Sequence, residues 1–347
     1  MKLFYFLISF LFFSCVNETS DSSIPEIQDN HSIIVVSNQI EEDITNDSLY
    51  VERAKINIQK SRFEEALKDL EKANLLDSTK GHTHYLIADV LLELAKQGKG
   101  NKESVHLSLN HFQFAILYGS DSSLSFQKGG EILLYIEKYE QSIELLLQSL
   151  SLDRNNFTTY NLLGYCYVEL NDIENAISCF KQSIGIKSDD EEAYLQLGNL
   201  YYSKKDSTAI KYYKNAVSIN PTNRIAYYNM AMVYEDLNDF SKSHDAYYKV
   251  LDLKMNDKLH IDALYNLGVM FQENLEDPKN AIDYYLELKR INPNHYLGLF
   301  QMAVCYQKLG DVIHAEQYFR DCLNINPEYK IAKERLEQLL SDNEKYK

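Results

Sequence analysis

The sequence predicts an all-α solenoid of about eight helical hairpins, closed by a C-terminal capping helix. Two observations predict it: a hairpin pattern over residues 157–188 and the recurrence of that pattern along the chain. In the hairpin, two apolar stripes at helical spacing flank a polar turn at Asn171-Asp172, and neither stripe can be buried without neighbours. The first stripe holds Tyr160, Leu163, Gly164 and Tyr167, and the second holds Ala176, Phe180 and Ser183.

The hairpin recurs at a period of about 34 residues, which is the signature of a repeat array. Both its leading aromatic residue and its glycine have counterparts upstream and downstream. Those of Tyr160 are Phe126, Tyr194 and Tyr227, and those of Gly164 are Gly130, Gly198 and Ala231. A stack of such hairpins buries the stripes that a single hairpin leaves exposed.

This pattern resembles the tetratricopeptide repeat (TPR), whose signature is an aromatic residue, Leu-Gly, Tyr, Ala, a second aromatic residue, Ala and Pro. In residues 157–188, both apolar stripes match the positions of this signature, with two mild departures. Ser183 stands where the family has Ala, and Ser188 where it has Pro. The resemblance covers nearly everything after about residue 46 and implies a right-handed α-solenoid of about eight TPR hairpins plus a C-terminal capping helix.

The repeat pattern divides the chain after residue 46 into eight repeats, a capping helix and a short tail. Three Asn-Pro steps support the boundaries, because Pro cannot continue a helix and its predecessor avoids helical geometry. They are Asn220-Pro221, Asn292-Pro293 and Asn326-Pro327. The predicted repeats are 47–80, 81–122, 123–156, 157–190, 191–223, 224–260, 261–295 and 296–329, followed by the cap 330–341 and the tail 342–347.

Residues 1–14 predict a signal peptide. One charge, Lys2, precedes an apolar run from Leu3 to Phe13 that is too short to span a bilayer. Ser14 and Cys15 end the run and resemble the lipobox of bacterial lipoproteins, in which the Cys is lipidated, although Phe12 and Phe13 depart from it. The alternative is an ordinary signal peptide that contains a Cys.

Residues 15–46 predict a lipidated Cys followed by an acidic, flexible tether. There is no Lys or Arg from Val16 to Asp47, and Ser, Asn, Asp and Thr dominate. Ser32 to Val36 is a short β-prone run within this segment.

Composition and motifs disfavour several function classes. A formal net charge of -16, from 35 basic and 51 acidic residues, argues against nucleic acid as a partner. His82 and His84 lack a third ligand, and we expect no metal, no cofactor and no catalytic site. We expect the remaining thiols, Cys166, Cys179, Cys305 and Cys322, to be buried. In an exported protein, oxidation of either pair within a hairpin would require helix geometry to bring the two Cα atoms within about 7 Å.

The TPR resemblance implies which residues face the concave groove: those one and five positions after each leading aromatic residue. The groove residues that we expect to bind a partner are Tyr85, Asn161, Tyr165, Asn199, Tyr202, Tyr228, Met232, Tyr265 and Phe300. Lys55 is the one lysine at these positions, so the groove lacks the basic clamp with which co-chaperone members of the family hold an acidic tail. Aromatic and Asn side chains suit an extended or helical apolar peptide.

We therefore expect a non-enzymatic scaffold of the bacterial cell envelope, anchored by lipid and exposed in the periplasm or at the outer-membrane surface. Its partner is expected to be a protein or peptide bound in the concave TPR groove. One alternative is a cytoplasmic or signal-anchored TPR adaptor. A second, from a resemblance of architecture alone, is an accessory subunit that docks or activates a cell-envelope enzyme.

Overall fold

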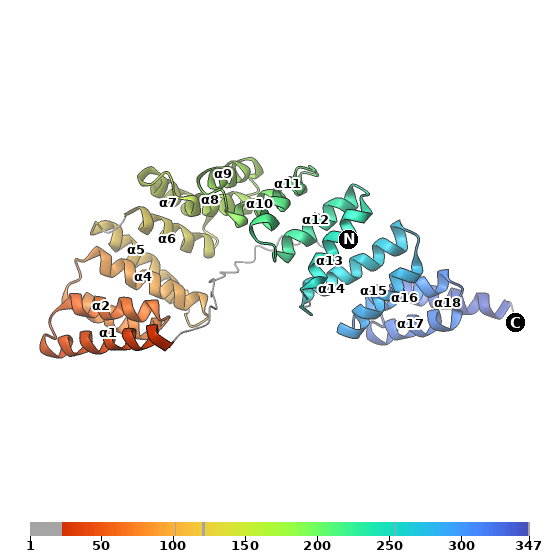
Figure 1. Cartoon of the computed structure of the whole chain (residues 1–347), viewed down its shortest axis with the longest axis horizontal. Coiled ribbons are helices and arrows are strands. Elements are labelled where there is room, and N and C mark those ends of the chain that lie inside the picture. Colours follow the sequence, from red (N-terminus) through yellow and green to blue (C-terminus); the bar gives the residue numbers. More distant parts are fainter. Residues whose placement is uncertain (1–22, 101, 120–121, 254, 346–347) are drawn as a thin grey trace. The chain divides into compact units, whose positions relative to one another are not determined.

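The computed structural model describes residues 23–100, 102–119, 122–253 and 255–345 (Figure 1). These residues form eighteen α-helices and one π-helical turn, and they contain no strand. The predicted all-α solenoid of helical hairpins is confirmed. The predicted signal peptide and Cys15 lie outside the described residues.

The chain groups into two compact units, with the boundary in the sequence between Ser188 and Asp189. The amino-terminal unit contains α1 (Ser23–Glu42), α2 (Asp47–Gln59), α3 (Phe63–Leu76), α4 (Gly81–Lys96), α5 (Lys102–Leu117), α6 (Ser122–Tyr135), α7 (Tyr139–Leu152), α8 (Phe157–Glu169) and α9 (Ile173–Ile186). The carboxy-terminal unit contains α10 (Glu191–Ser203), α11 (Ala209–Ile219), α12 (Arg224–Asp236), α13 (Phe240–Asp252), α14 (Lys258–Val269), the π-helical turn η1 (Met270–Asn274), α15 (Pro278–Ile291), α16 (Tyr296–Lys308), α17 (Val312–Ile325) and α18 (Lys330–Lys345).

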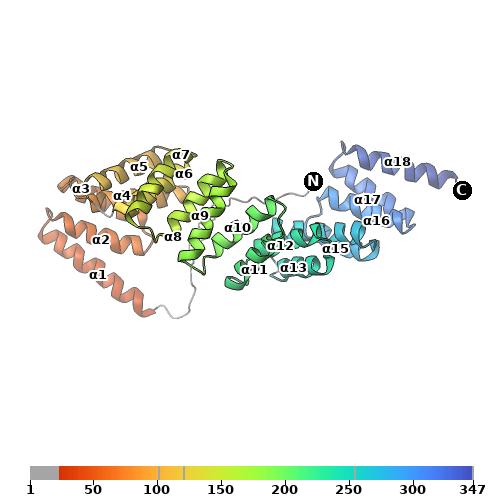
Figure 2. The same ribbon diagram turned by 90° about the horizontal axis from the view of Figure 1, so that it is seen from above.

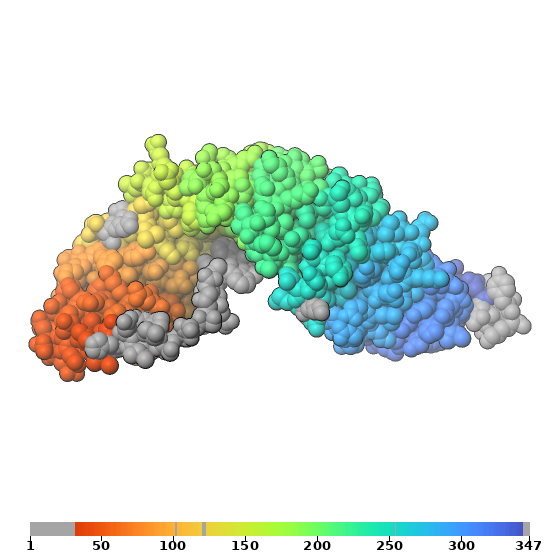
Figure 3. Space-filling view, in the orientation of Figure 1, coloured from red at the N-terminus to blue at the C-terminus, as the bar shows by residue number. Residues whose placement is uncertain are grey.

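Consecutive helices pair into hairpins, from α2 with α3 to α16 with α17 (Figures 1 and 2). Within each unit, the second helix of a hairpin also packs against the first helix of the next. Buried apolar side chains fill the space between neighbouring helices within each unit. Figure 3 shows the outer surface of the same helices. The apolar core of each unit is therefore a series of contacts between neighbours along the chain, as expected for a repeat protein.

The two helices of a hairpin approach closely where a glycine on the first faces an aromatic ring on the second. In α8, a Cβ added to Gly164 would lie 2.6 Å from Cζ of Phe180. Gly198 meets Tyr213 in the same way, and Gly268 meets Tyr285. At these three positions glycine allows the close approach, because an added Cβ would occupy the space of the ring. The sixth hairpin has Ala231 at the same repeat position.

Every hairpin turn contains one residue in the left-handed backbone region. In the fourth hairpin this residue is Asn171, and the next amide, Asp172 N–H, donates to the carbonyl of Tyr167 at 2.8 Å, as in a Schellman motif. The Asp172 side chain then accepts from the amide of Asn175 and caps α9. The left-handed residues are Ser61, Gly98, Glu137, Asn171, Lys205, Asn238, Glu276 and Gly310.

The predicted flexible tether is wrong for residues 23–42, which form helix α1. Val36 and Ile40 are buried on α1, where they pack with Tyr50 and Ala73 of the first hairpin. Arg53 of α2 donates to the hydroxyl of Ser37 at 3.1 Å. The run that looks β-prone in isolation is helical because this docking outweighs its local propensity.

The predicted end of the capping helix at residue 341 is also wrong, because α18 continues through residues 342–345. Leu336 and Leu339 of α18 are buried with Ala332 against the last hairpin, so the helix covers its apolar face as a cap. In the described part of the chain, no helix has both the length and the apolar character needed to span a membrane.

We predict that Gly164→Ala lowers the free energy of unfolding by about 1–3 kcal/mol, because the new methyl group displaces the ring of Phe180. Gly185→Ala is the matched control in the same hairpin, since an added Cβ there meets nothing within 4 Å. It should raise stability by up to about 1 kcal/mol through helix propensity. Urea unfolding followed by circular dichroism measures both variants. Equal stability of the two would contradict the close-approach account.

Candidate functional site

The first helices of successive hairpins contact one another and form one face of each unit, here called the first-helix face. In the amino-terminal unit α4 contacts α6 and α6 contacts α8, and in the carboxy-terminal unit α10 contacts α12 and α12 contacts α14. The groove residues expected from the sequence all lie on these helices. The polar contacts that join neighbouring first helices therefore define the candidate site.

In the carboxy-terminal unit, Asn199 joins three helices. Its Oδ1 accepts from the hydroxyl of Tyr213 at 2.9 Å and from Nδ2 of Asn229 at 2.9 Å. Burial raises the pKa of Tyr213, so its hydroxyl stays protonated and donates. Asn199 itself donates to Gln196, which donates to Glu192 at 2.7 Å.

A second network surrounds Asn266 of α14. Its Nδ2 donates to the hydroxyls of Tyr228 at 2.9 Å and Tyr247 at 3.1 Å. The Tyr247 hydroxyl donates to Glu235 at 3.4 Å. Beside this network, Tyr202 of α10 donates to Asp236 of α12 at 2.8 Å. Burial, followed by this bond and the negative charge of Asp236, raises the pKa of Tyr202.

A third network centres on Gln272, which lies in the π-helical turn. Gln272 is only 1% exposed. Its Oε1 accepts from the hydroxyl of Tyr285 at 3.1 Å and from Sγ of Cys305 at 3.1 Å. Its Nε2 donates to Gln301 at 2.9 Å and to Glu273 at 2.7 Å. The wider π turn thus places one amide where it links α15 and α16.

In the amino-terminal unit, ion pairs rather than amide networks join the first helices α4 and α6. Lys128 Nζ lies 3.3 Å from Asp89 and 3.5 Å from Glu131, and Lys96 Nζ lies 2.8 Å from Glu131. Burial alone would lower the pKa of Lys128, but the charges of Glu131 and Asp89 outweigh it and raise that pKa. Lys96 and Lys128 are therefore engaged by carboxylates of the same chain.

The structure divides the expected groove residues into two groups by exposure. Tyr85, Tyr165, Tyr202 and Tyr265 are half-buried and reach the surface of the first-helix face. Tyr228 and Met232 are each 2% exposed, and the other buried members are Asn161, Asn199 and Phe300. The buried group forms the floor of the face. Tyr228 packs against Tyr247 of its own hairpin and accepts from Asn266 of the next, and Phe300 packs against Phe319.

Several residues of these networks are absent from the expected set, although the sequence holds a signal for them. An amide side chain recurs two positions after the leading residue of each carboxy-terminal repeat. These amides are Gln196, Asn229, Asn266 and Gln301. Glu235, Asp236 and Gln272 lie six or seven residues after these amides, about two turns further on, where the sequence pattern is less regular.

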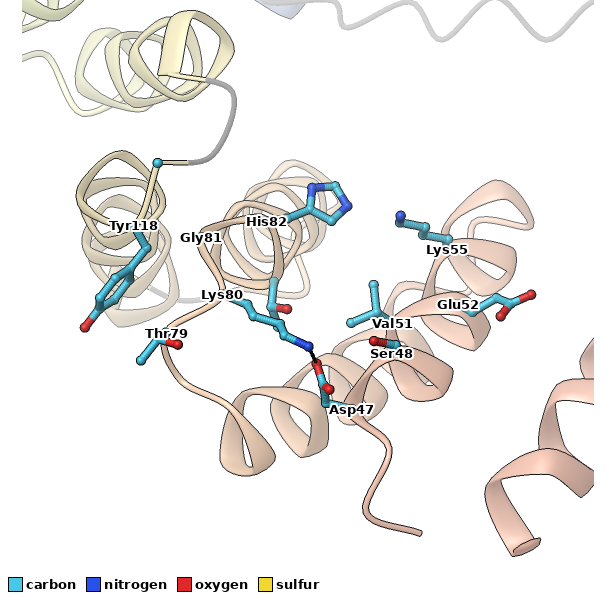
Figure 4. A pocket seen from close by; sticks show the side chains of 12 residues that line it. Asp47, Ser48, Val51, Glu52, Lys55, Thr79, Lys80, Gly81, His82 and Tyr118 are labelled. Carbon is cyan, nitrogen blue, oxygen red and sulfur yellow. Dashed lines mark hydrogen bonds and ion pairs between the residues drawn. The ribbon is translucent and has the colours of Figure 1, made fainter. Parts of the chain in front are cut away.

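A separate hollow of about 640 Å³ lies in the amino-terminal unit (Figure 4). It is bounded by the first turns of α2 and α4, and Tyr118 lines its far side. Lys80 crosses the opening to pair with Asp47 at 2.5 Å, while Lys55 and His82 lie on the opposite side of that pair. The positive and negative side chains that line the hollow are equal in number.

The described titratable groups fit packing better than catalysis. Nδ1 of His84 lies 2.9 Å from Nδ1 of His111, and Nε2 of His84 lies 2.9 Å from the carbonyl of Ser78. Burial raises the pKa of Cys166 to about 11 and that of Cys305 to about 12, which keeps both thiols protonated. Among the residues that the structure describes, no cluster of His, Cys, Asp or Glu is suited to hold a metal ion.

Models of known repeat families match much of the chain. A model described as tetratricopeptide repeat matches residues 47–80, 191–223, 225–257, 261–295 and 298–329. A second, described as TPR repeat, matches residues 164–205, and together the matches cover more than half of the chain. The chain belongs to the tetratricopeptide-repeat family. The family resemblance of the sequence is thereby confirmed, and the networks described above are those of a TPR protein.

Curated relatives share this TPR region at low identity. Protein O-mannosyl-transferase TMTC3 of Homo sapiens is 23% identical over 218 residues, which cover 58% of this chain and 23% of that protein. TPR repeat-containing protein MJ1428 of Methanocaldococcus jannaschii is 23% identical over 317 residues, covering 82% of this chain and 53% of that protein. The chain thus spans about a quarter of the first relative and about half of the second.

Solved structures share the fold. The C-terminal part of a TPR repeat-containing protein from Cytophaga hutchinsonii is 16% identical and superposes with a TM-score of 0.52. The match covers 82% of this chain and 98% of that one. This likeness supports the arrangement of TPR hairpins and carries no information on partners.

We predict that Gln272→Met and Tyr285→Phe are strongly coupled. Gln272→Met alone leaves the buried Tyr285 hydroxyl without its partner and should cost about 1–3 kcal/mol of unfolding free energy. The double variant should cost clearly less than the sum of the single variants, because Phe removes the hydroxyl that needs a partner. A double-mutant cycle from urea unfolding measures the coupling. Additive single effects would contradict the network.

Proposed function

We propose that this TPR protein is a non-enzymatic scaffold that binds an extended segment of a partner protein on the first-helix face of its carboxy-terminal unit. The observation that supports this most is the chain of amide and tyrosine contacts across α10, α12, α14 and α16. These contacts fix the floor of the face through Asn199, Asn266 and Gln272. Above the floor, Tyr202 and Tyr265 remain half-exposed.

A fixed floor favours binding because a partner does not have to order it. Each immobilised side chain costs about 0.5–1.5 kcal/mol when binding itself must order it. Tyrosine rings offer contact area with few rotatable bonds, and a hydroxyl at their edge can bond to a peptide backbone. Tyr202 and Tyr265 therefore combine area and polarity at low entropic cost.

A non-catalytic role accords with the family and with the chemistry of the described residues. TMTC3 is named as a transferase, but this chain covers 23% of that protein. Burial keeps the thiols of Cys166 and Cys305 protonated, and His84 packs against Phe114 and bonds to the carbonyl of Ser78. If the bound partner were a cell-envelope enzyme, the scaffold would be the accessory subunit given above as an alternative.

The same proposal places the scaffold at the cell envelope through a lipid on Cys15. Its support is the sequence alone, in which an apolar run of the length of a signal peptide ends at Ser14-Cys15. A Cys carrying more than one acyl chain would hold the protein stably at a membrane.

To test the binding face, we predict that Tyr202→Ala with Tyr265→Ala abolishes recovery of the partner. The partner is first defined by crosslinking in the native cell and mass spectrometry, and its recovery is then measured by quantitative pull-down. Tyr248→Ala with Leu286→Ala is the matched control, because both residues are exposed on second helices. Full recovery with the first pair, with native circular dichroism, would refute the assignment of this face.

To test the anchor, we predict that Cys15→Ala moves the protein from the membrane fraction to the soluble fraction. Intact-mass analysis of the parent protein should show a chain that begins at a lipidated Cys15. A parent protein with its full amino terminus would instead support the signal-anchored adaptor.

A further inference from the structure

The first turn of α4 forms one wall of the hollow in the amino-terminal unit (Figure 4). α4 begins at Gly81, and the side chain of the preceding Lys80 does not cap it. The amides of Thr83 and His84 bond to the carbonyl of Lys80. The amides of Gly81 and His82 have no acceptor within the described parts of the chain. Free amides at the positive end of a helix attract anions.

The side chain of Thr83 adds a further donor to the same wall. Thr83 lines the hollow and is only 2% exposed. Among the residues that the structure describes, its hydroxyl has no hydrogen-bond partner. By comparison, the buried hydroxyls of Ser108 and Ser142 each donate to a backbone carbonyl at 2.6 Å. A buried hydroxyl without a partner costs folding free energy, which a ligand in the hollow would recover.

The opposite wall, on α2, contributes a cation. The side chain of Lys55 points across the hollow toward His82 (Figure 4). Burial and then the charge of Lys55 lower the pKa of His82, so the ammonium group lies close to that imidazole. The ion pairs that α2 forms with other described residues are those of Asp47 and Arg53, and Lys55 forms none.

The two carboxylates that line the hollow leave this cation unbalanced. Asp47 pairs with Lys80 at 2.5 Å, and Glu52 extends away from His82 (Figure 4). Lys55 and the first amides of α4 therefore lack an anionic partner, although acidic and basic side chains are equal in number here. The volume of about 640 Å³ lies within the range of pockets that hold small molecules.

From this arrangement we propose that the hollow binds the phosphate group of a small phosphorylated molecule, between Lys55 and the first turn of α4. A phosphate offers three acceptor oxygens in different directions, so it can accept from donors on both walls. A carboxylate has two oxygens in one plane and matches fewer of these donors. Because Gly81 has no side chain, the ligand can approach the backbone of α4 closely.

This site is independent of the proposed partner-binding face, because it lies in the amino-terminal unit. Isothermal titration calorimetry with the full-length chain tests it, using inorganic phosphate, glycerol 3-phosphate and acetate at constant ionic strength. We expect saturable binding of both phosphate probes, with glycerol 3-phosphate the tighter, and binding of acetate that is weaker by about tenfold or more. Acetate binding as tight as phosphate, or no binding of either phosphate probe, would overturn the proposal.

The decisive variant is Lys55→Met with Thr83→Val, which removes one donor from each wall and keeps the shape of Thr83. We expect the affinity for glycerol 3-phosphate to fall by about tenfold or more. Lys55→Met alone changes an exposed residue, leaves folding intact and should cost about threefold. The matched control is Lys72→Met, which removes the same charge from an exposed position on α3 and should change affinity by less than about twofold. An equal loss in the control would show non-specific attraction and overturn the proposal.

The imidazole of His82 gives a second readout of where the phosphate binds. The charged groups that line the hollow around it are Lys55, Asp47 and Glu52 on α2 and Lys80 before α4. A bound phosphate adds negative charge beside Lys55 and should raise the lowered pKa of His82. Nuclear magnetic resonance titration of His82, with and without saturating glycerol 3-phosphate, measures this change. An unchanged pKa in the saturated protein would place the phosphate elsewhere and overturn the proposal.

Discussion

The fold of this TPR protein depends on an aromatic ring that packs directly against the backbone of the opposing helix. Gly164, Gly198 and Gly268 allow this approach, since any added methyl group would overlap the ring. Where the ring is Phe180, the contact is apolar and complete. Where the ring is that of Tyr213 or Tyr285, its buried hydroxyl needs a hydrogen-bond partner, and it donates to Asn199 or Gln272 on the first helix of the hairpin or the π-helical turn that follows it.

That requirement shapes the first-helix face of the carboxy-terminal unit. Asn199 and Gln272 each receive a hydroxyl from a core tyrosine, and each also bonds to the next first helix. One amide side chain thus bonds to the second helix of its own hairpin and to the first helix of the next hairpin. This explains why Tyr213 and Tyr285 are tyrosines, because a Phe at either position would leave the amide oxygen without this donor.

The repeat architecture could be predicted from the sequence because the period makes each hairpin support the others. Helix α1 could not, since its consecutive β-branched residues at 33–36 look like a short strand and its other residues are mostly Ser, Asn and acidic residues. Its helicity depends on docking against Tyr50 and on the bond from Arg53 to Ser37, which no local pattern reveals. Helical docking of this kind is decided by tertiary contact rather than propensity.

The binding face was only partly predictable for a related reason. Helical position predicts the face on which Tyr228 and Met232 lie, but not that packing within the carboxy-terminal core leaves each of them only 2% exposed. The exposed edge belongs to Tyr202, Tyr265 and carboxylates such as Asp236.

Hydrogen–deuterium exchange of the full-length chain, with and without its crosslinked partner, tests the account most directly. The account predicts that binding slows exchange in residues 191–203, 224–236 and 258–274, which form the first helices α10, α12 and α14 with η1. Binding stabilises these helices against the local opening that exchange requires. Protection confined to the second helices α11, α13 and α15, or to the amino-terminal unit, would contradict it.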